Sequence, residues 1–166
     1  MTTPTPTTKA QVCSLKRDTP QLIEPGPYQI VRFPFGTLES SDAYEMHQVQ
    51  QQDGYTIASW DGDDRSGLIW PSRAGWGHLY AMIQWESGDY TELRDQFVRD
   101  PLHFGSDPEN TTATDHRPAS VGMQCFTKSH GIFVDPAVPL ALRVTHNDTV
   151  ARNLVLAELK LVIYDA

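Results

Sequence analysis

Histidine is the residue type in this chain with the most versatile chemistry, because imidazole binds metals and transfers protons near neutral pH. The six histidines are His47, His78, His103, His116, His130 and His146. No two are spaced as H-x-H or H-x3-H, the spacings that point two ligands from one strand toward a shared ion. We therefore expect no metal and no other cofactor. We expect His78 and His146 to face solvent or a subunit interface.

An acidic segment offers a second candidate site. Residues 61–67 read D-G-D-D-R-S-G and superficially resemble a calcium-binding loop. The EF-hand pattern requires an oxygen ligand at its fifth position and glycine at its sixth, where this segment has Arg65 and Ser66. A tight polar hairpin is the simpler interpretation. Trp60 precedes Asp61, and an exposed ring beside a carboxylate suits a sugar, so glycan binding stays open.

Motifs for nucleophilic catalysis are missing from the sequence. It contains no G-x-S-x-G elbow and no phosphate-binding glycine loop, and Cys125 lacks the local signature of a thiol protease. The other cysteine, Cys13, also lies in an alternating pattern, where a free thiol behaves as a small hydrophobe. A disulfide between the two is a less favoured alternative. We predict no catalytic residue, and hence a protein that assembles or binds rather than an enzyme.

The net charge of the chain limits the classes of partner that it can bind. The formal net charge is −8, which argues against nucleic acid and against anionic lipid. The longest apolar runs, such as residues 79–83, are far too short to span a membrane. The N-terminus has no apolar stretch behind a basic start, so we expect synthesis in a cytoplasm without later secretion.

The first ten residues differ from the rest of the chain. They contain five Thr and two Pro and can bury almost nothing, so we predict an extended arm at 1–10 and one folded domain at 11–166. The arm and the first strand together carry Lys9, Lys16 and Arg17, whereas seven acidic residues and no Lys or Arg lie between Arg32 and Arg65. The arm is therefore a candidate attachment segment that docks on an acidic partner. Its candidate contact residues are Thr5, Lys9, Lys16 and Arg17. A solvated acidic surface and a tail without a role are the alternatives.

Most of the remaining sequence alternates with the period of β-strands. The expected strands cover residues 12–17, 28–35, 55–60, 67–70, 78–85, 121–125, 140–146 and 153–164, while 92–98 fits a strand or a helix and 101–119 is expected to be a long polar loop. Eight to ten short strands indicate an all-β sandwich or barrel.

Two of these segments show which face would enter the core. In 78–85 the core face is expected to hold Leu79, Ala81, Ile83 and Trp85. In the last strand the core face is Val155, Ala157, Leu159, Leu161 and Ile163, and the opposite face is Leu154, Leu156, Val162 and Tyr164. Apolar residues on both faces predict that one face packs in the core and the other in a subunit contact. Trp70 fits either environment.

The order of these segments resembles the TNF-like jelly-roll superfamily, which includes complement-type globular heads and tail or surface proteins of phages that infect actinobacteria. The central strand of that group is similar to residues 74–87, A-G-W-G-H-L-Y-A-M-I-Q-W-E-S. Its opening strand resembles residues 12–23, its second strand 30–33, its penultimate hairpin 139–146 and its closing strand 154–163. Here a second glycine, Gly77, interrupts the glycine–aromatic step of the central strand.

The resemblance implies an antiparallel jelly-roll β-sandwich that assembles as a compact homotrimer. From it we expect a structural protein of a phage virion, assembled in the host cytoplasm and displayed on the particle surface. A capsid decoration (minor capsid) protein that binds the major capsid protein or another virion protein is favoured, since the short arm is no fibre shaft. The alternative is a minor tail protein or a tail-tip module that binds a receptor or a host surface glycan.

Overall fold

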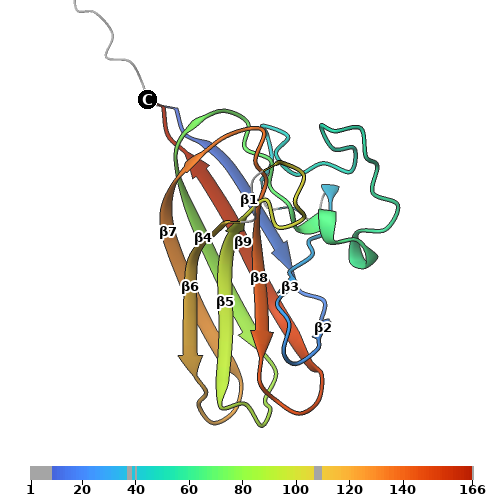
Figure 1. Ribbon diagram of the computed structural model, residues 1–166, viewed down its shortest axis with the longest axis vertical. Helices are drawn as coiled ribbons and strands as arrows, with labels where there is room; N and C mark the ends of the chain where they lie inside the picture. Colours follow the sequence, from blue (N-terminus) through green and yellow to red (C-terminus); the bar gives the residue numbers. More distant parts are fainter. Residues whose placement is uncertain (1–8, 37–38, 40, 107–109, 166) are drawn as a thin grey trace, which may run out of the picture.

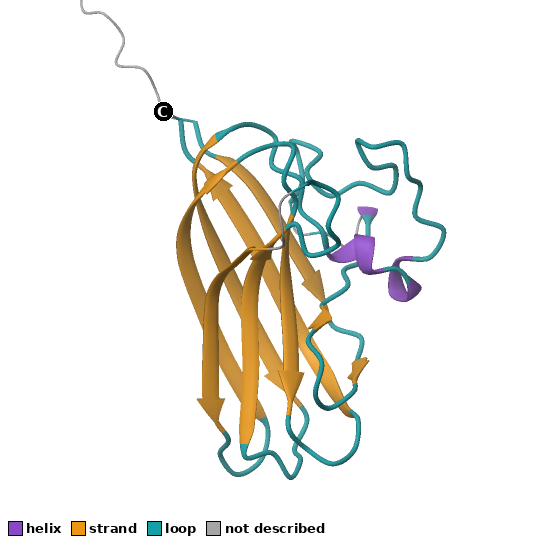
Figure 2. Cartoon of the chain, in the orientation of Figure 1, coloured by secondary structure: helices purple, strands orange, loops and turns teal. Residues whose placement is uncertain are grey.

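The computed structural model describes residues 9–36, 39, 41–106 and 110–165, which form two antiparallel sheets packed face to face (Figures 1 and 2). The first sheet contains β1 (Gln11–Arg17), β9 (Arg152–Ile163), β4 (Gly75–Trp85) and β7 (Gln124–Val134), in that order, with β2 (Gln21–Ile23) also paired to β9. The second contains β3 (Gln29–Ile30), β8 (Leu140–His146), β5 (Glu92–Arg99) and β6 (Asn110–Pro118). This is the predicted all-β jelly-roll sandwich.

Both described ends of the chain lie at one end of the sandwich. Gln11 at the start of β1 pairs with Ile163 at the end of β9, and the Lys9 backbone N–H donates to Asp165 at 2.6 Å. The connection from β3 to β4 runs beside the sandwich and contains the short 3-10 turns η2 (Trp60–Gly62) and η3 (Asp64–Gly67) (Figure 2). The predicted arm, residues 1–10, lies outside the described residues except for Lys9 and Ala10.

The inner faces of the two sheets form one continuous core. On β4 the core side chains are Leu79, Ala81, Ile83 and Trp85, as the alternation predicts. Gly77 belongs to the same face, where an added Cβ would lie 3.1 Å from Leu161, so the extra glycine lets β4 approach its neighbours closely. A smaller apolar cluster beside this core includes Trp70, which is 8% exposed and is therefore a core residue within the chain.

Several strand predictions need correction. Residues 92–99 form strand β5, one of the two forms that the pattern allowed, whereas the expected polar loop 101–119 contains β6, whose side chains carry almost no apolar pattern. The expected strand 28–35 shortens to β3, although Val31 and Phe33 remain buried. The expected strands 55–60 and 67–70 make only isolated bridges, and the segment 61–67 forms consecutive 3-10 turns rather than a hairpin.

A β-bulge overturns part of the predicted face assignment in β9. Gln84 pairs with Leu156 and Trp85 with Leu154, so Val155 is an extra residue opposite β4. A one-residue insertion exchanges the two faces of the strand beyond it. Leu154 is consequently buried in the core, contrary to the prediction, whereas Leu156 and Val155 are both half-buried.

His146 was also assigned to the wrong environment. It is buried in the core, where its Nε2 lies 2.8 Å from the Ile23 carbonyl oxygen and its Nδ1 accepts from the Asp148 backbone N–H at 3.1 Å. The ring packs edge-on against Trp85 and Tyr90, with 5.5 Å between centroids in each pair. One donor and one acceptor satisfy the neutral imidazole, so burial leaves no charge unpaired.

Asp148 joins two loops at the end of the sandwich that lies opposite the chain ends. Its carboxylate accepts from the Asp89 backbone N–H at 2.8 Å and from Arg152 Nε at 2.7 Å, and it also accepts from the Thr149 backbone N–H. Burial raises the pKa of Asp148, but the donors, Arg152 first, outweigh that effect and lower this pKa to about 2. The ionised carboxylate is thus the stabilising form.

Replacement of this carboxylate gives a pH-dependent prediction. A carboxyl group whose folded pKa is depressed stabilises the fold above its unfolded pKa of about 3.9, and the stabilisation disappears as pH falls through the folded value. We expect Asp148→Asn to lower the melting temperature near neutral pH. The difference from wild type should shrink to nothing as the pH approaches about 2. Thermal melts of both proteins across this range measure it; a constant difference would contradict the assignment.

Candidate functional site

The outward face of the first sheet is the most distinctive surface of the molecule. Because side chains alternate along β4, His78, Tyr80 and Met82 point away from the core. In the pairing register Trp76 lies opposite Phe133 of β7, and His78 lies opposite Val162 of β9. This face therefore carries apolar and aromatic side chains that no other part of the described chain covers.

Five side chains gather at one end of this face, and we name them the aromatic patch. They are Trp76, His78, Tyr80, Phe133 and Tyr164. Trp76, Phe133, Tyr80 and Tyr164 are 46%, 70%, 39% and 39% exposed. The Trp76 and Phe133 rings meet edge to face, and the His78 and Tyr80 rings stack, each pair at 4.9 Å between centroids. Such packing fixes the rings on rigid strands.

A glycine allows Trp76 to lie against β7. A Cβ atom at Gly131 would come within 2.5 Å of Trp76 Cζ2, closer than real Cβ contacts allow. Gly131 lies between Ser129 and Phe133 on the outward face of β7. The position of the indole thus depends on the absence of a side chain at this residue.

The middle of the outward face, next to the aromatic patch, is polar and hollow. A shallow pocket of about 420 Å³ is lined there by Tyr80, Met82, Thr127, Ser129, Glu158 and Lys160. Lys160 Nζ lies 3.5 Å from Glu158 Oε2, and Lys16 of β1 lies opposite Glu158 in the pairing register. The face therefore combines an apolar end with an adjoining polar, charge-paired region, as contact surfaces between proteins do.

An ionic cluster closes the sandwich where the outer strands β6 and β7 meet. Lys128 of β7 points inward, 3.3 Å from Asp95 Oδ1, and it also contacts Asp115. Arg117 Nε donates to Asp95 at 2.6 Å. Donation from Lys128, the largest of the causes, lowers the pKa of Asp115. Inward-pointing charges on outer strands disfavour edge-to-edge pairing with another chain.

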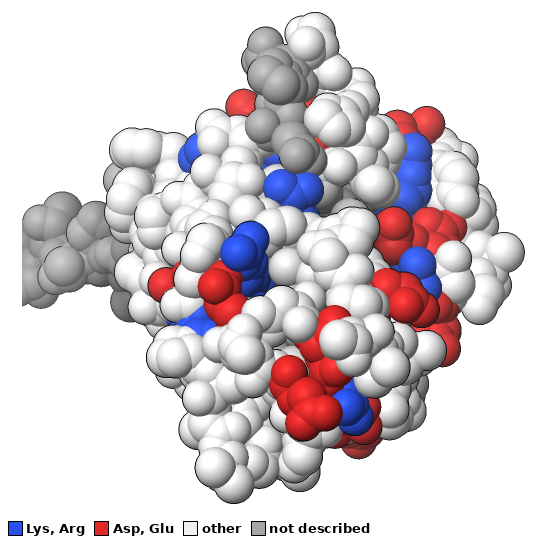
Figure 3. Space-filling model, turned by 60° about the horizontal axis from the view of Figure 1, so that its bottom comes forward, with Lys and Arg blue, Asp and Glu red and all other residues white. Residues whose placement is uncertain are grey.

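The predicted attachment residues differ in their surroundings where the structure describes them. Thr5 lies outside the described residues. Lys9 is exposed at the chain end, with Nζ 5.8 Å from the Tyr44 ring, and Lys16 is exposed on the outward face. In the view of Figure 3, Lys and Arg side chains lie beside Asp and Glu rather than in a separate basic patch. Of the candidates that the structure describes, Lys9 and Lys16 are exposed to a partner.

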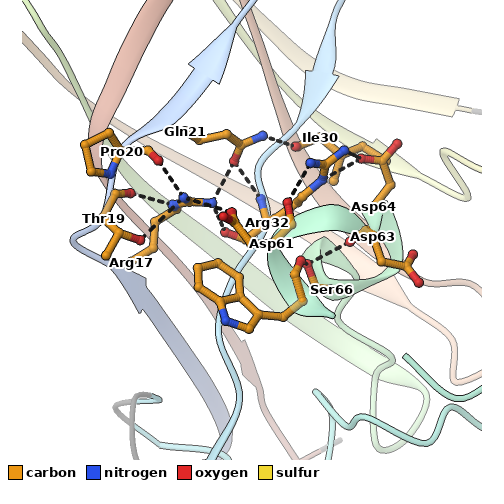
Figure 4. A network of polar contacts seen from close by, with 11 residues as sticks. Arg17, Thr19, Pro20, Gln21, Ile30, Arg32, Asp61, Asp63, Asp64 and Ser66 are labelled. Atoms are coloured by element: carbon orange, nitrogen blue, oxygen red, sulfur yellow. Dashed lines mark hydrogen bonds and ion pairs between the residues drawn. The ribbon is translucent and has the colours of Figure 1, made fainter. Parts of the chain in front are cut away.

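Arg17, in contrast, is an internal structural residue and was wrongly predicted as a contact. It is 1% exposed, and its guanidinium donates to the carbonyl oxygens of Thr19, Pro20 and Arg32 at 2.8–3.0 Å (Figure 4). It also bonds Gln21 Oε1 at 3.0 Å and Asp61 at 3.3 Å.

The same network includes Trp60 and Asp61, the pair on which the glycan hypothesis rests. The Arg17 guanidinium lies 5.0 Å from the centre of the Trp60 ring and pairs with Asp61, so both side chains have internal partners. Burial lowers the pKa of Arg17, and the neighbouring Asp61 opposes that effect. The network fastens η2 to β1 and β2.

Hydrogen bonds between its own side chains and backbone groups hold the acidic segment 61–67 in place. Asp63 accepts from the Arg65 backbone N–H at 3.0 Å, and the Ser66 hydroxyl donates to the carbonyl oxygens of Trp60 and Asp63. Over the described ranges, no group of three His, Cys, Asp or Glu side chains is placed to hold a metal ion. No helix within those same ranges is long and apolar enough to span a membrane.

The remaining candidates, His47 and the two cysteines, lie in different parts of the molecule. His47 is buried, with Nε2 2.6 Å from the Ser66 carbonyl oxygen and Nδ1 3.2 Å from Glu39 Oε1. Both cysteines are free: Cys13 is buried in the core, and Cys125 is exposed on β7. Burial raises the pKa of the Cys13 thiol.

One exposed cluster was not foreseen from the sequence. The Arg65 guanidinium lies between the rings of Tyr55 and Phe104, 4.1 Å from each centroid, and bonds Asp53 at 2.7 and 2.9 Å. The Tyr55 hydroxyl donates to Asp63 at 2.7 Å. Since Phe104 comes from the β5–β6 connection, far away in the sequence, local patterns contain no signal for this stack.

This chain has matches among solved structures but none among family models or curated sequences. The globular domain of zebrafish complement 1qA protein superposes with a TM-score of 0.62 at 11% identity, over 93% of this chain and 97% of that one. Murine APRIL at pH 5.0 gives 0.56 at 12%, over 93% and 99%. Eiger TNF from S. frugiperda gives 0.53 at 10%, over 93% and 92%.

These likenesses extend over nearly the whole chain and over nearly the whole of each neighbour. The chain therefore has the TNF-like jelly-roll fold that these three neighbours share. At such low identity the comparison establishes the fold and leaves the function to be argued from the surface.

The contact between Gly131 and Trp76 yields a prediction. We expect Gly131→Val to leave the sandwich folded but to displace the Trp76 indole, because the new side chain occupies its place. Near-UV circular dichroism and quenching of tryptophan fluorescence should both change. Thr127→Val, an exposed position on the same strand and face, serves as the control and should change neither. A Gly131→Val spectrum equal to wild type would contradict the described packing.

Proposed function

We propose that this protein is a non-enzymatic assembly unit that forms a homotrimer through the outward face of its first sheet. The observation that carries the proposal is the aromatic patch. Isolated apolar side chains are common on protein surfaces, whereas a contiguous cluster of large rings marks a contact site. Tryptophan, tyrosine and phenylalanine are enriched in the buried centres of such contacts.

The rigidity of the patch supports association without rearrangement. Its rings come mainly from the long strands β4 and β7, which pair with each other over eleven residues. Side chains already held by packing lose little conformational freedom when a partner covers them. Three copies around one axis are the assembly that the TNF-like resemblance implies, and a closed ring leaves no apolar face uncovered.

A catalytic role is not part of the proposal, because the groups that could carry chemistry have structural partners. The His146 ring uses both nitrogens within the core. Asp95 is neutralised by Arg117 and Lys128, and Asp148 holds two loops together. The non-enzymatic role therefore rests on how these side chains are used as well as on the fold.

We further propose that the trimer decorates the surface of a phage particle. The resemblance of residues 12–165 to jelly-roll proteins of phage surfaces supports this. Both described chain ends leave from one end of the sandwich, so a single attachment there leaves the opposite end outward (Figure 1). The exposed Lys9 suits contact with an acidic lattice protein.

A glycan-binding module, as on a tail tip, is the competing function. The exposed Tyr55 and Phe104 rings beside Asp53 and Asp63 favour it, since sugars stack on rings and bond carboxylates. A glycan array separates the two functions. Specific binding that is lost in Tyr55→Ala would support the module over the decoration protein.

A charge placed in the aromatic patch should break the trimer. We expect light scattering to give three times the 18.6 kDa chain mass for wild type and a single chain mass for Phe133→Asp. An unpaired charge in a buried contact is strongly unfavourable. Because Phe133 is 70% exposed within one chain, folding should persist by circular dichroism.

Val121→Asp is the matched control for this experiment. Val121 is fully exposed in the β6–β7 turn, at the opposite end of β7, so the same charge there should leave the trimer intact. A monomeric wild-type protein at micromolar concentration, or a Phe133→Asp trimer as stable as wild type, would contradict the proposal.

Deletion of residues 2–10 tests the attachment role of the arm. We expect an unchanged melting temperature, because Thr and Pro bury no core, and a loss of co-sedimentation with particles that lack the protein. Binding of the full chain should also weaken as salt rises, since exposed ion pairs are screened over about 8–10 Å. Undiminished binding of the deletion variant would reject the attachment role, and loss of folding would place the arm in the core.

A further inference from the structure

The stack around Arg65 extends further than its two rings. Behind Phe104 lies the Trp70 indole, 5.8 Å away between ring centroids and inclined to it by only 7°. Tyr55, Arg65, Phe104 and Trp70 thus form one column of planar groups, which we name the stacked column. Trp70 closes the inner end at 8% exposure, whereas Tyr55 is 43% exposed at the outer end. The column therefore ends on an open aromatic ring.

The stacked column lies apart from the aromatic patch. Tyr55, Arg65 and Trp70 belong to the β3–β4 connection, which runs beside the sandwich (Figure 1), and Phe104 belongs to the β5–β6 connection. The aromatic patch, in contrast, lies on the outward face of the first sheet. The column is consequently a surface that the proposed trimer contact does not require.

Local hydrogen bonds fix the groups of the column before any ligand arrives. The Gln51 backbone N–H donates to the Tyr55 carbonyl oxygen at 2.8 Å, and Gln51 Nε2 donates to the Arg65 carbonyl oxygen at 3.0 Å. On the opposite side, the buried Asp100 carboxylate accepts from the Phe104 backbone N–H at 2.9 Å. Side chains held in this way lose little conformational freedom when a ligand covers them.

The Tyr55 ring is also electronically suited to a cation. Its hydroxyl donates to Asp63 Oδ2 at 2.7 Å, and this hydrogen bond raises the pKa of the hydroxyl. A phenol that donates to a carboxylate is polarised by it, which increases the electron density of the ring. Because a cation is attracted to the negative face of an aromatic ring, the exposed end of the column favours a positively charged ligand.

The charges around the column point to the same class of ligand. Asp53, Asp61 and Asp64 each pair with an arginine of this chain. Asp63 has no basic side chain as a partner in the described part of the chain, so its negative charge is not neutralised there. The carboxylate that holds the Tyr55 hydroxyl is thus the one with a charge to offer.

A groove next to the column provides room for the residues that flank such a ligand. Its volume is about 300 Å³, and its walls include Glu45, Gln48, Gln51, Trp70 and Pro136. Trp70 is at the same time the inner end of the column, and Gln51 bonds Arg65. The exposed Glu45 carboxylate and the glutamine amides supply acceptors for backbone N–H groups and for a second basic side chain.

We propose that the outer end of the stacked column binds an arginine side chain from a basic segment of a partner protein. The guanidinium lies flat on the Tyr55 ring, and its N–H groups donate to the Asp63 carboxylate. Arginine suits this site better than lysine, because its planar fork stacks on a ring and bonds a carboxylate at the same time. Outward from Phe104, the column then alternates between rings and cations.

A matched pair of peptides, added to the full chain, tests the proposal. The probe is the capped pentapeptide Gly-Arg-Gly-Arg-Gly, and its control carries citrulline, the neutral isostere, in place of both arginines. We expect the arginine peptide to shift the backbone amide resonances of Tyr55 and Arg65 in NMR spectra. The citrulline peptide should bind at least about fivefold more weakly, since it lacks the cation. Binding of the arginine peptide should also weaken as salt rises.

Variants of the protein remove the ring and the carboxylate separately. Tyr55→Leu and Asp63→Asn should each weaken binding of the arginine peptide about three- to fivefold, the effect of losing one exposed contact to a cation. Asparagine still accepts from the Arg65 backbone N–H through Oδ1, so Asp63→Asn keeps η3 folded. Glu24→Gln removes the same charge at an exposed position between β2 and β3 and should leave the affinity unchanged.

Two results would overturn the assignment: equal affinity for the arginine and citrulline peptides, or undiminished binding of the arginine peptide by Tyr55→Leu. Specific binding of a neutral sugar at Tyr55, by a protein that does not bind the arginine peptide, would also reject it and would assign the ring to the glycan-binding function. None of these results alters the mass measured by light scattering, so a failure here is distinguishable from a failure of the trimer.

Discussion

The pairing of β4 with β9 is the interaction on which the rest of the structure depends. These strands lie at the centre of the first sheet, and their register runs from Gly77–Ile163 to Gln84–Leu156 before the bulge. Side chains alternate along a strand, so this register decides which residues enter the core. A slip by one residue would exchange Leu79 and Ile83 for Tyr80 and Met82. The core face of both strands and the outward position of His78 and Tyr80 follow from this one alignment.

The outward face of this sheet and its outer edge at β7 differ in how they can contact another chain. Its outward face keeps large rings exposed on rigid strands, whereas its outer strand β7 hides a lysine that is paired with Asp95. A strand with an inward-pointing charge is a poor template for pairing with another chain. Association is thereby directed to the face and away from the edge. Such a division favours a closed assembly over an open fibre.

The sequence predicted the sandwich and the β4 faces because the hydrophobic alternation there is unbroken. It failed where a local feature changes the pattern. The β-bulge at Val155 reversed the face of Leu154, and β6 escaped notice because Ala113 is its only apolar side chain. Arg17 was taken for a surface contact, since a charge in the sequence does not show that the following turn, Arg32 and Asp61 all supply hydrogen-bond acceptors to it.

The aromatic patch and the groove near Trp70 could likewise be predicted from the sequence only in part. Apolar residues on both faces of β9 predicted an outer contact face, but Phe133 joins the patch only through its register with Trp76. The groove near Trp70 is built from three segments, one of which includes Pro136 in the β7–β8 turn. No local pattern specifies such a combination, because only the folded chain brings the segments together.

The central claim is that the outward face is covered by other copies of the chain, and side-chain footprinting of the native protein tests it most directly. Hydroxyl radicals oxidise exposed aromatic rings, and Tyr55 and Phe104 provide exposed references on the same molecule. The account predicts that Trp76, Tyr80 and Phe133 react much more slowly than these references at micromolar concentration and as fast as them after dilution to the monomer. Oxidation of Trp76 and Phe133 at the rate of Tyr55 and Phe104 at every concentration would contradict it.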